Sequence, residues 1–235
     1  MNRFEQLLAE SWFSKKPAKK EPIQFLSTTL TNSPDIDDNL FEKHAPDVTH
    51  IDHRDMINYY TGNSSPMNKH LWRKKFGTAV DNSYLDKNAD KISDILKTAP
   101  AAKKDLVVYS GVNGERNALH KGDLHIPAFT SSSSDSRIAS GFAHSRHTVE
   151  DLPNADGDIV PHKVHHMIKI HIKKGQQVGA YVAEHSNYSD EKEFLINKNH
   201  TLHLDGTHED HRQNDDDHTK NTYFRIHNAT ITPEE

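Results

Sequence analysis

The pattern of apolar residues changes at Asp105, and this change constrains the fold more than any other feature of the chain. Before it, residues 49–104 carry apolar side chains at the spacing of amphipathic helices. After it come short runs of β-branched and aromatic residues, which are typical of strands. A run of helices followed by a run of strands predicts an α+β fold, in which a helical lobe packs on a core of two small antiparallel sheets.

The segments that follow this pattern can be placed along the chain. We expect helices at 52–60, 67–76, 85–96 and 137–143. We expect strands at 106–109, 126–130, 165–172, 177–183, 192–197, 201–204 and 223–231. The stretch 205–220 is rich in Asp, His and Asn, and we expect a surface loop there.

The first 48 residues differ in composition from the rest. A short amphipathic helix is expected at Arg3–Phe13, and the basic, proline-interrupted segment Lys15–Pro22 has the character of a linker. We therefore predict a partly disordered N-terminal peptide and linker over 1–48. One domain follows over 49–235, with a helical lobe at 49–104 and a β core at 105–235.

Composition excludes several classes of protein. The chain has no cysteine, so it can form neither disulfides nor thiolate metal sites. No apolar run approaches the roughly 20 residues that span a bilayer, and Met1–Ser14 lacks the apolar stretch of a secretory signal. The net charge of −5 gives no general argument for binding nucleic acid or membranes.

Histidine is unusually frequent, with 19 residues. The spacing of His200, His203, His208 and His211 would allow zinc ligation. However, no cysteine supports such a site and the region reads as a loop. We therefore expect solvated surface histidines and no metal.

A candidate site for chemistry lies at Tyr188–Glu193, directly before the apolar run Phe194-Leu195-Ile196. If this stretch is extended, Glu191 and Glu193 point to one face and Lys192 to the other. Two carboxylates at the mouth of a buried strand suit a reaction that develops positive charge. A solvated charged turn is the alternative interpretation.

Two further segments give this stretch a context. Leu106-Val107-Val108-Tyr109-Ser110-Gly111 is a strand that ends in glycine, and Phe129-Thr130-Ser131-Ser132-Ser133 comes next. Together with Tyr188-x-x-Glu191-x-Glu193, they resemble in order and spacing the mono-ADP-ribosyltransferases of the Arg-Ser-Glu class. That class includes the clostridial-type exoenzyme toxins and the Alt/Mod-type transferases of tailed bacteriophages. The resemblance covers roughly residues 50–230.

The resemblance implies an activity and roles for three residues. NAD would be the substrate, and ADP-ribose would pass to arginine side chains of host proteins with release of nicotinamide. Glu193 would hydrogen-bond the ribose and stabilise its positive charge, and Ser131 would fix the rotamer of Glu193. Glu191 would hold the acceptor guanidinium and take up its proton. Hydrolysis of NAD by water, or a non-catalytic binding domain, are the alternatives.

The remaining residues of the motifs would line the site. Ser132 and Ser133 would support the strand or the nicotinamide pocket, and Phe129 either lies beside the cofactor or forms a buried flank. Gly111 either lets backbone approach the nucleotide or merely ends its strand. Tyr188 would contact the acceptor at the rim or simply pack. The last of them, Tyr109, is placed near the cofactor, although a core position suits it better.

One position departs from the family pattern. Its first motif carries an arginine that pairs with the dinucleotide, and this chain has Ser110 there. Either another cation replaces it, with Arg116 and Arg137 the nearest in sequence, or the affinity for NAD is reduced.

The N-terminus carries a second resemblance. Arg3–Ser11 is similar to the head-targeting peptides of proteins packaged in tailed-phage capsids, which are cut after a Leu-x-Glu triplet, here Leu8-Ala9-Glu10. It implies a protein that loses Met1–Glu10, travels in the virion and acts in the host cytoplasm.

Overall fold

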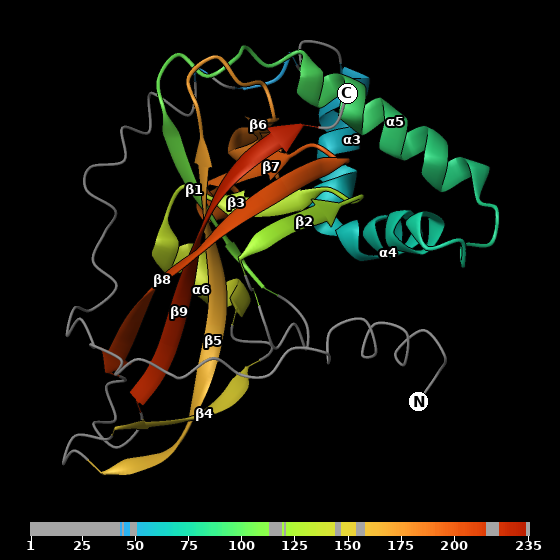
Figure 1. Cartoon of the computed structure of the whole chain (residues 1–235). Coiled ribbons are helices and arrows are strands. Elements are labelled where there is room, and N and C mark those ends of the chain that lie inside the picture. Colours follow the sequence, from blue (N-terminus) through green and yellow to red (C-terminus); the bar gives the residue numbers. More distant parts are fainter. Residues whose placement is uncertain are drawn as a thin grey trace.

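Three helices precede the strands in the computed structural model, which describes residues 43, 45–47, 51–112, 119, 121–143, 147–153, 158–214 and 221–233 (Figure 1). They are α3 (Ile51–Gly62), α4 (Ser64–Lys75) and α5 (Ser83–Lys97). The break between α3 and α4 falls at Asn63, and the side chain of Asn82 caps α5 by accepting from the Leu85 N–H at 3.1 Å. The three predicted helices are therefore confirmed. The helix expected at Arg3–Phe13 lies outside the described residues.

The rest of the described chain is mostly strand. Its elements are β1 (Leu106–Gly111), β2 (Gly122–Ile126), β3 (Thr130–Ser133), α6 (Ser136–Ala143), β4 (Thr148–Pro153), β5 (Ile159–Ile172), β6 (Gly179–Tyr181), η1 (Ala183–His185), η2 (Ser189–Glu191), β7 (Glu193–Ile196), β8 (His200–Asn214) and β9 (Asn221–Pro233). The α+β class is confirmed.

The strands form one mixed nine-stranded sheet, in the order β2-β8-β9-β5-β1-β3-β7-β6 with β4 added to β5. We expected two antiparallel sheets, and the two groups of strands are instead joined through β1. This strand pairs with β5 along its whole length, whereas its pairing with β3 rests on the single pair Tyr109 and Ser133. The parallel pairing of β5 with β9 also departs from the expected antiparallel pattern.

The strand β4 was not predicted, and other expected segments differ from the structure. The strand expected at 126–130 is in fact the end of β2 and the start of β3, with 127–129 between them. The loop expected at 205–220 is mostly strand, since β8 continues to Asn214 after a bulge between Leu204 and His208. Its polar residues are held by cross-strand partners such as Arg225 on β9, which binds Asp210.

Two apolar cores lie on the sheet. The larger one joins side chains of β1, β5, β8 and β9, including Val108, Ile170 and Ile231. The second joins the three helices to β6 and β7, where Tyr60, Ile92 and Leu195 are fully buried. Figure 1 shows α3, α4 and α5 gathered beside this end of the sheet. The helical lobe is therefore anchored beside the strand that carries Glu193.

Helix α6 packs close against the end of β1, and Gly111 makes this approach possible. A Cβ added to Gly111 would lie 2.6 Å from the backbone nitrogen of Ala143 and 2.8 Å from the carbonyl carbon of Phe142. No side chain fits between these backbones. Gly111 is therefore required for helix packing.

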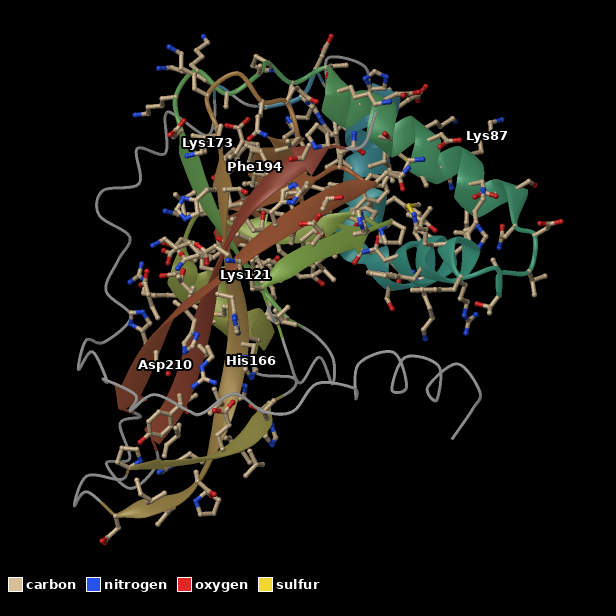
Figure 2. The ribbon with its side chains drawn as sticks, in the orientation of Figure 1. Lys87, Lys121, His166, Lys173, Phe194 and Asp210 are labelled. Carbon is tan, nitrogen blue, oxygen red and sulfur yellow. The ribbon has the colours of Figure 1, made fainter. Side chains whose placement is uncertain are left out.

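A polar network fills the far part of the sheet, where β4, β5, β8 and β9 run beyond the helices (Figure 1). Arg225 donates to both oxygens of Asp210, at 2.7 and 2.9 Å, and to both oxygens of Glu150, at 2.9 and 3.0 Å. Beside it, the rings of His166 and His227 stack with a nitrogen–nitrogen distance of 3.1 Å. Figure 2 shows His166 and Asp210 in this part of the sheet.

This network predicts a loss of stability in mild acid. Burial, together with His166, His208 and Arg225, lowers the pKa of His227 to about 3, and burial also lowers the pKa of His166. Below about pH 6.5 the unfolded chain therefore binds protons that the folded chain excludes, and the free energy of unfolding falls. Urea unfolding at a series of pH values between 7.5 and 5 should show this fall. In His227→Gln the dependence should be weaker, and an unchanged slope would contradict this explanation.

Candidate active site

Glu193 is the first residue of β7 and is 5% exposed. Its carbonyl accepts from the Val182 N–H at 2.9 Å, and Ser186 Oγ donates to its carboxylate at 3.4 Å. Burial raises the pKa of Glu193, and the nearby Glu191 raises it further, while hydrogen bonds from Ser131 and Ser186 act in the opposite direction. The strand therefore holds a carboxylate in a largely dry position, with hydroxyl groups around it.

Glu191 lies in a turn and not in a strand. It ends η2, its N–H donates to the Tyr188 carbonyl at 3.0 Å, and Lys192 follows in the left-handed region at φ 47°. The expectation that alternation would bring both acids to one face is therefore wrong, because the backbone between them is not extended. The negative charge of Glu191 nevertheless raises the pKa of Glu193, so the two acids interact electrostatically. Burial raises the pKa of Glu191 as well.

The serines of β3 face β7, in the register that pairs Ser133 with Glu193. Ser133 Oγ donates to the Glu191 carbonyl at 2.7 Å, and Ser132 Oγ donates to the Phe194 carbonyl at 2.5 Å. A hydrogen-bonding effect of Ser131 lowers the pKa of Glu193. Ser132 and Ser133 thus fix the backbone on both sides of Glu193, while Ser131 favours its ionised form. The structure therefore brings five predicted site residues together.

Tyr60 of α3 belongs to the same group of residues, although no role was predicted for it. It is fully buried, and its hydroxyl accepts from Asn68 Nδ2 at 3.0 Å. Burial raises its pKa, as does the charge of Glu193, and Ser131 hydrogen-bonds its hydroxyl. The only sequence signal for a role of Tyr60 was its spacing from Asn68 on consecutive helices. Packing of the two helices explains that spacing equally well.

Phe129 lies beneath this group. Its ring is 3% exposed and meets the Tyr60 ring edge-on, with the centroids 5.2 Å apart. The structure thus places Phe129 in the core between β3 and the helical lobe, as the buried-flank alternative describes. Phe129 therefore supports the position of the Tyr60 ring.

The remaining residues of the first motif lie away from the carboxylates. Ser110 is buried, and its Oγ donates to the Ser131 carbonyl at 2.9 Å, which links β1 to β3. Tyr109 packs against the cluster that includes Ala139 and Met167. Among the predicted acceptor contacts, Tyr188 is 54% exposed at the start of the η2 turn, where a partner can reach it.

Of the two arginines considered as replacements at Ser110, Arg137 has a carboxylate partner. Its guanidinium lies 2.9 Å from Asp135, and this pairing lowers the pKa of the Asp135 carboxyl. Arg116 lies outside the described residues. On α3, Arg54 is close enough to His185 to contribute to the lowering of that histidine's pKa, after burial.

No group of histidines and acids among the described residues could hold a metal ion. The expectation of solvated histidines is wrong for His200, which is 1% exposed with a ring nitrogen 2.8 Å from the Asn197 carbonyl. The side chain of His211 is also largely buried, at 13% exposed, whereas those of His203 and His208 are 40% and 41% exposed. The reason is that the region forms a strand, which turns alternate side chains inward.

A hollow of about 230 Å³ lies elsewhere, between α4, α5 and the turn after β7. Its lining includes Lys74, Asp86 and Lys198, and none of the predicted site residues.

In the described part of the chain, no helix is long and apolar enough to cross a membrane.

The comparisons with known proteins agree with this architecture. Residues 154–229 match the ADP-ribosyltransferase exoenzyme family, and this segment contains both Glu191 and Glu193. A search of curated protein sequences finds no match.

Several solved structures share the fold. Plx2a, an ADP-ribosyltransferase toxin from Paenibacillus larvae, has a TM-score of 0.57 and 16% identity, over 83% of this chain and 92% of that one. C3stau2 from S. aureus, solved with NAD, has a TM-score of 0.54 and 13% identity, over 90% and 100%. BECa of C. perfringens, an ADP-ribosylating toxin solved with NADH, has a TM-score of 0.60 and 18% identity, over 88% and 50%.

The expected α+β, ADP-ribosyltransferase-like fold is thus confirmed apart from its two-sheet core, while the resemblance to the phage enzymes stays a prediction. The chain has an ADP-ribosyltransferase-like fold, and its residues 154–229 match the ADP-ribosyltransferase exoenzyme family.

Proposed function

We propose that the protein is an NAD-dependent mono-ADP-ribosyltransferase that modifies arginine side chains of host proteins and releases nicotinamide. The observation that supports it most is the buried carboxylate of Glu193, which has hydroxyl partners and a second acid close by in Glu191. The family match covers both acids. C3stau2 and BECa were solved with NAD and NADH, which favours NAD as the substrate here.

Glu193 would act on the ribose. When the bond between ribose and nicotinamide breaks, its electron pair leaves with nicotinamide and positive charge develops on the ribose. An ionised carboxylate in a dry site stabilises that charge far more than one in water would. Ser131 and Ser186 would favour the ionised form and hold its orientation, against the effect of burial.

Glu191 would act on the acceptor. A guanidinium is protonated at neutral pH and is a poor nucleophile. A carboxylate can hold it through two hydrogen bonds and accept its proton as the nitrogen attacks the ribose. The raised pKa of Glu191 makes this carboxylate a better base than an ordinary surface glutamate.

Incubation of the purified protein with labelled NAD and host lysate tests the proposal. We expect label on protein, linked to arginine, and release of nicotinamide. Release of nicotinamide without labelled protein would instead indicate an NAD glycohydrolase. Neither product would indicate a binding protein, an alternative that Ser110 favours because the family arginine is missing there.

Tyr60→Phe should lower the rate of nicotinamide release about tenfold, because it removes a hydroxyl that interacts with Ser131 and Glu193 while keeping the ring that packs on Phe129. Tyr59→Phe is the matched control, since this neighbouring ring is 43% exposed. Initial rates of both variants with NAD give the comparison. Equal rates for Tyr60→Phe and wild type would remove Tyr60 from the mechanism.

We also propose, from the resemblance of Arg3–Ser11 alone, that the protein is packaged in a phage virion and acts in the host cytoplasm. These residues lie outside the described part of the chain. Mass spectrometry of the virion protein should find an N-terminus at Ser11, and one at Met1 would contradict the proposal.

A further inference from the structure

The turn between β6 and β7, residues 183–192, is hydrogen-bonded to the end of α3 through one residue, Asn187. The Asn187 backbone N–H donates to Thr61 Oγ1 at 3.0 Å, and its side-chain Nδ2 donates to the Asn58 carbonyl. Asn187 lies directly between Ser186, which bonds Glu193, and Tyr188. This contact therefore connects the turn that carries Glu191 with the helix that carries Tyr60.

Gly62 makes room for this contact. A Cβ added there would lie 2.5 Å from Asn187 Nδ2 and 3.3 Å from its Cγ, and its three nearest neighbours all belong to the Asn187 side chain. The space beside the last residue of α3 is thus occupied by the Asn187 amide. Because the amide is the end of a rotatable side chain, a methyl group at Gly62 would displace it without disturbing the helix.

The two acids are held in different ways. Glu193 is fixed by β7, through the pairing of β7 with β3 and β6. Glu191 and Tyr188 lie in the turn, which is exposed over residues 187–190 and half-buried at Glu191, whose carbonyl accepts from Ser133 Oγ. Loss of the Asn187 contact would therefore loosen the turn and leave Glu193 in place.

We infer that Asn187 is a positioning residue, which holds Glu191 and Tyr188 where an acceptor side chain must bind. It is not required for NAD cleavage itself. This inference rests on the proposed function, because it assigns the turn to the acceptor and the strand to NAD. It makes the junction of α3 and the turn a determinant of the ratio between transfer and hydrolysis.

The test is a double-mutant cycle with Asn187→Ala and Gly62→Ala, assayed for both products. Each single variant should lower transfer to protein or to a free guanidine acceptor about tenfold, since a small displacement of a positioned group is costly. Hydrolysis of NAD should stay within about twofold in each, as exposed hydrogen bonds contribute little to stability. The double variant should be no worse than either single one, because both remove the same contact.

Hydrogen exchange of residues 183–192 supplies a readout that needs no activity. Exchange should be faster in both single variants and unchanged in Asn228→Ala, a control that loses an amide contact to Thr207 on distant strands. If exchange is faster in the variants but the wild-type protein has no activity towards NAD, the proposed function is wrong and the contact between Asn187 and α3 is still supported. Unchanged exchange, or equal losses of transfer and hydrolysis, would overturn the role of Asn187.

Discussion

Replacing Glu193 by glutamine should lower nicotinamide release and transfer together, each by about 1,000-fold or more. The substitution keeps the shape of the side chain and can still hydrogen-bond Ser131 and Ser186. It removes the negative charge of Glu193, which is 5% exposed at the start of β7. Hydrolysis and transfer share the step that breaks the bond to nicotinamide, so the substitution should slow both.

The measurement is the initial rate of nicotinamide release at saturating NAD, with and without an acceptor. Glu184→Gln is the matched control, since it removes an exposed acid from the same connection between β6 and β7. That variant should behave as wild type. A Glu193→Gln enzyme with more than about a tenth of the wild-type rate would show that the charge on the ribose is stabilised elsewhere.

Replacing Glu191 by glutamine should separate the two reactions. Transfer to arginine should fall by about 100-fold or more, because an amide cannot take the proton of the guanidinium. Hydrolysis should fall much less, because water needs no such base close to the acceptor position and Glu193 remains. Removing the Glu191 charge also removes its Coulomb effect, so the pKa of Glu193 should fall.

The same enzyme preparation can be assayed for ADP-ribosylated guanidine and for free ADP-ribose. The expected result is a product ratio that shifts strongly towards hydrolysis. A parallel loss of both products would show that Glu191 acts on NAD as Glu193 does, and the acceptor assignment would then be wrong.

Much of the fold could be predicted because local patterns and tertiary packing agree. The three helices follow their apolar spacing, and β1, β5 and β7 follow runs such as Leu106–Val108 and Phe194–Ile196. The strand β8 could not be followed to its end, because Asp210 reads as a loop residue until its cross-strand partner Arg225 is known. The joining of the strands into one sheet depends on the single pair Tyr109 and Ser133, which no local pattern reveals.

Only part of the site could be predicted from the sequence. The order of the motifs indicated Ser131, Glu191 and Glu193, and the structure brings these residues together. It did not indicate Tyr60 or Asn187, since each acquires its partner only when α3 packs beside β7. Nor could alternation along a strand predict the geometry of the two acids, because the left-handed Lys192 lies between them.

The most direct test of the proposed activity is to map the modification. Wild-type protein would be incubated with NAD and an equimolar mixture of two peptides that differ only in arginine or asparagine, followed by mass spectrometry. We predict ADP-ribose on arginine alone. After the nicotinamide produced by hydrolysis is subtracted, one nicotinamide should be released for each modified peptide. Modification of asparagine, or no consumption of NAD at all, would contradict the account.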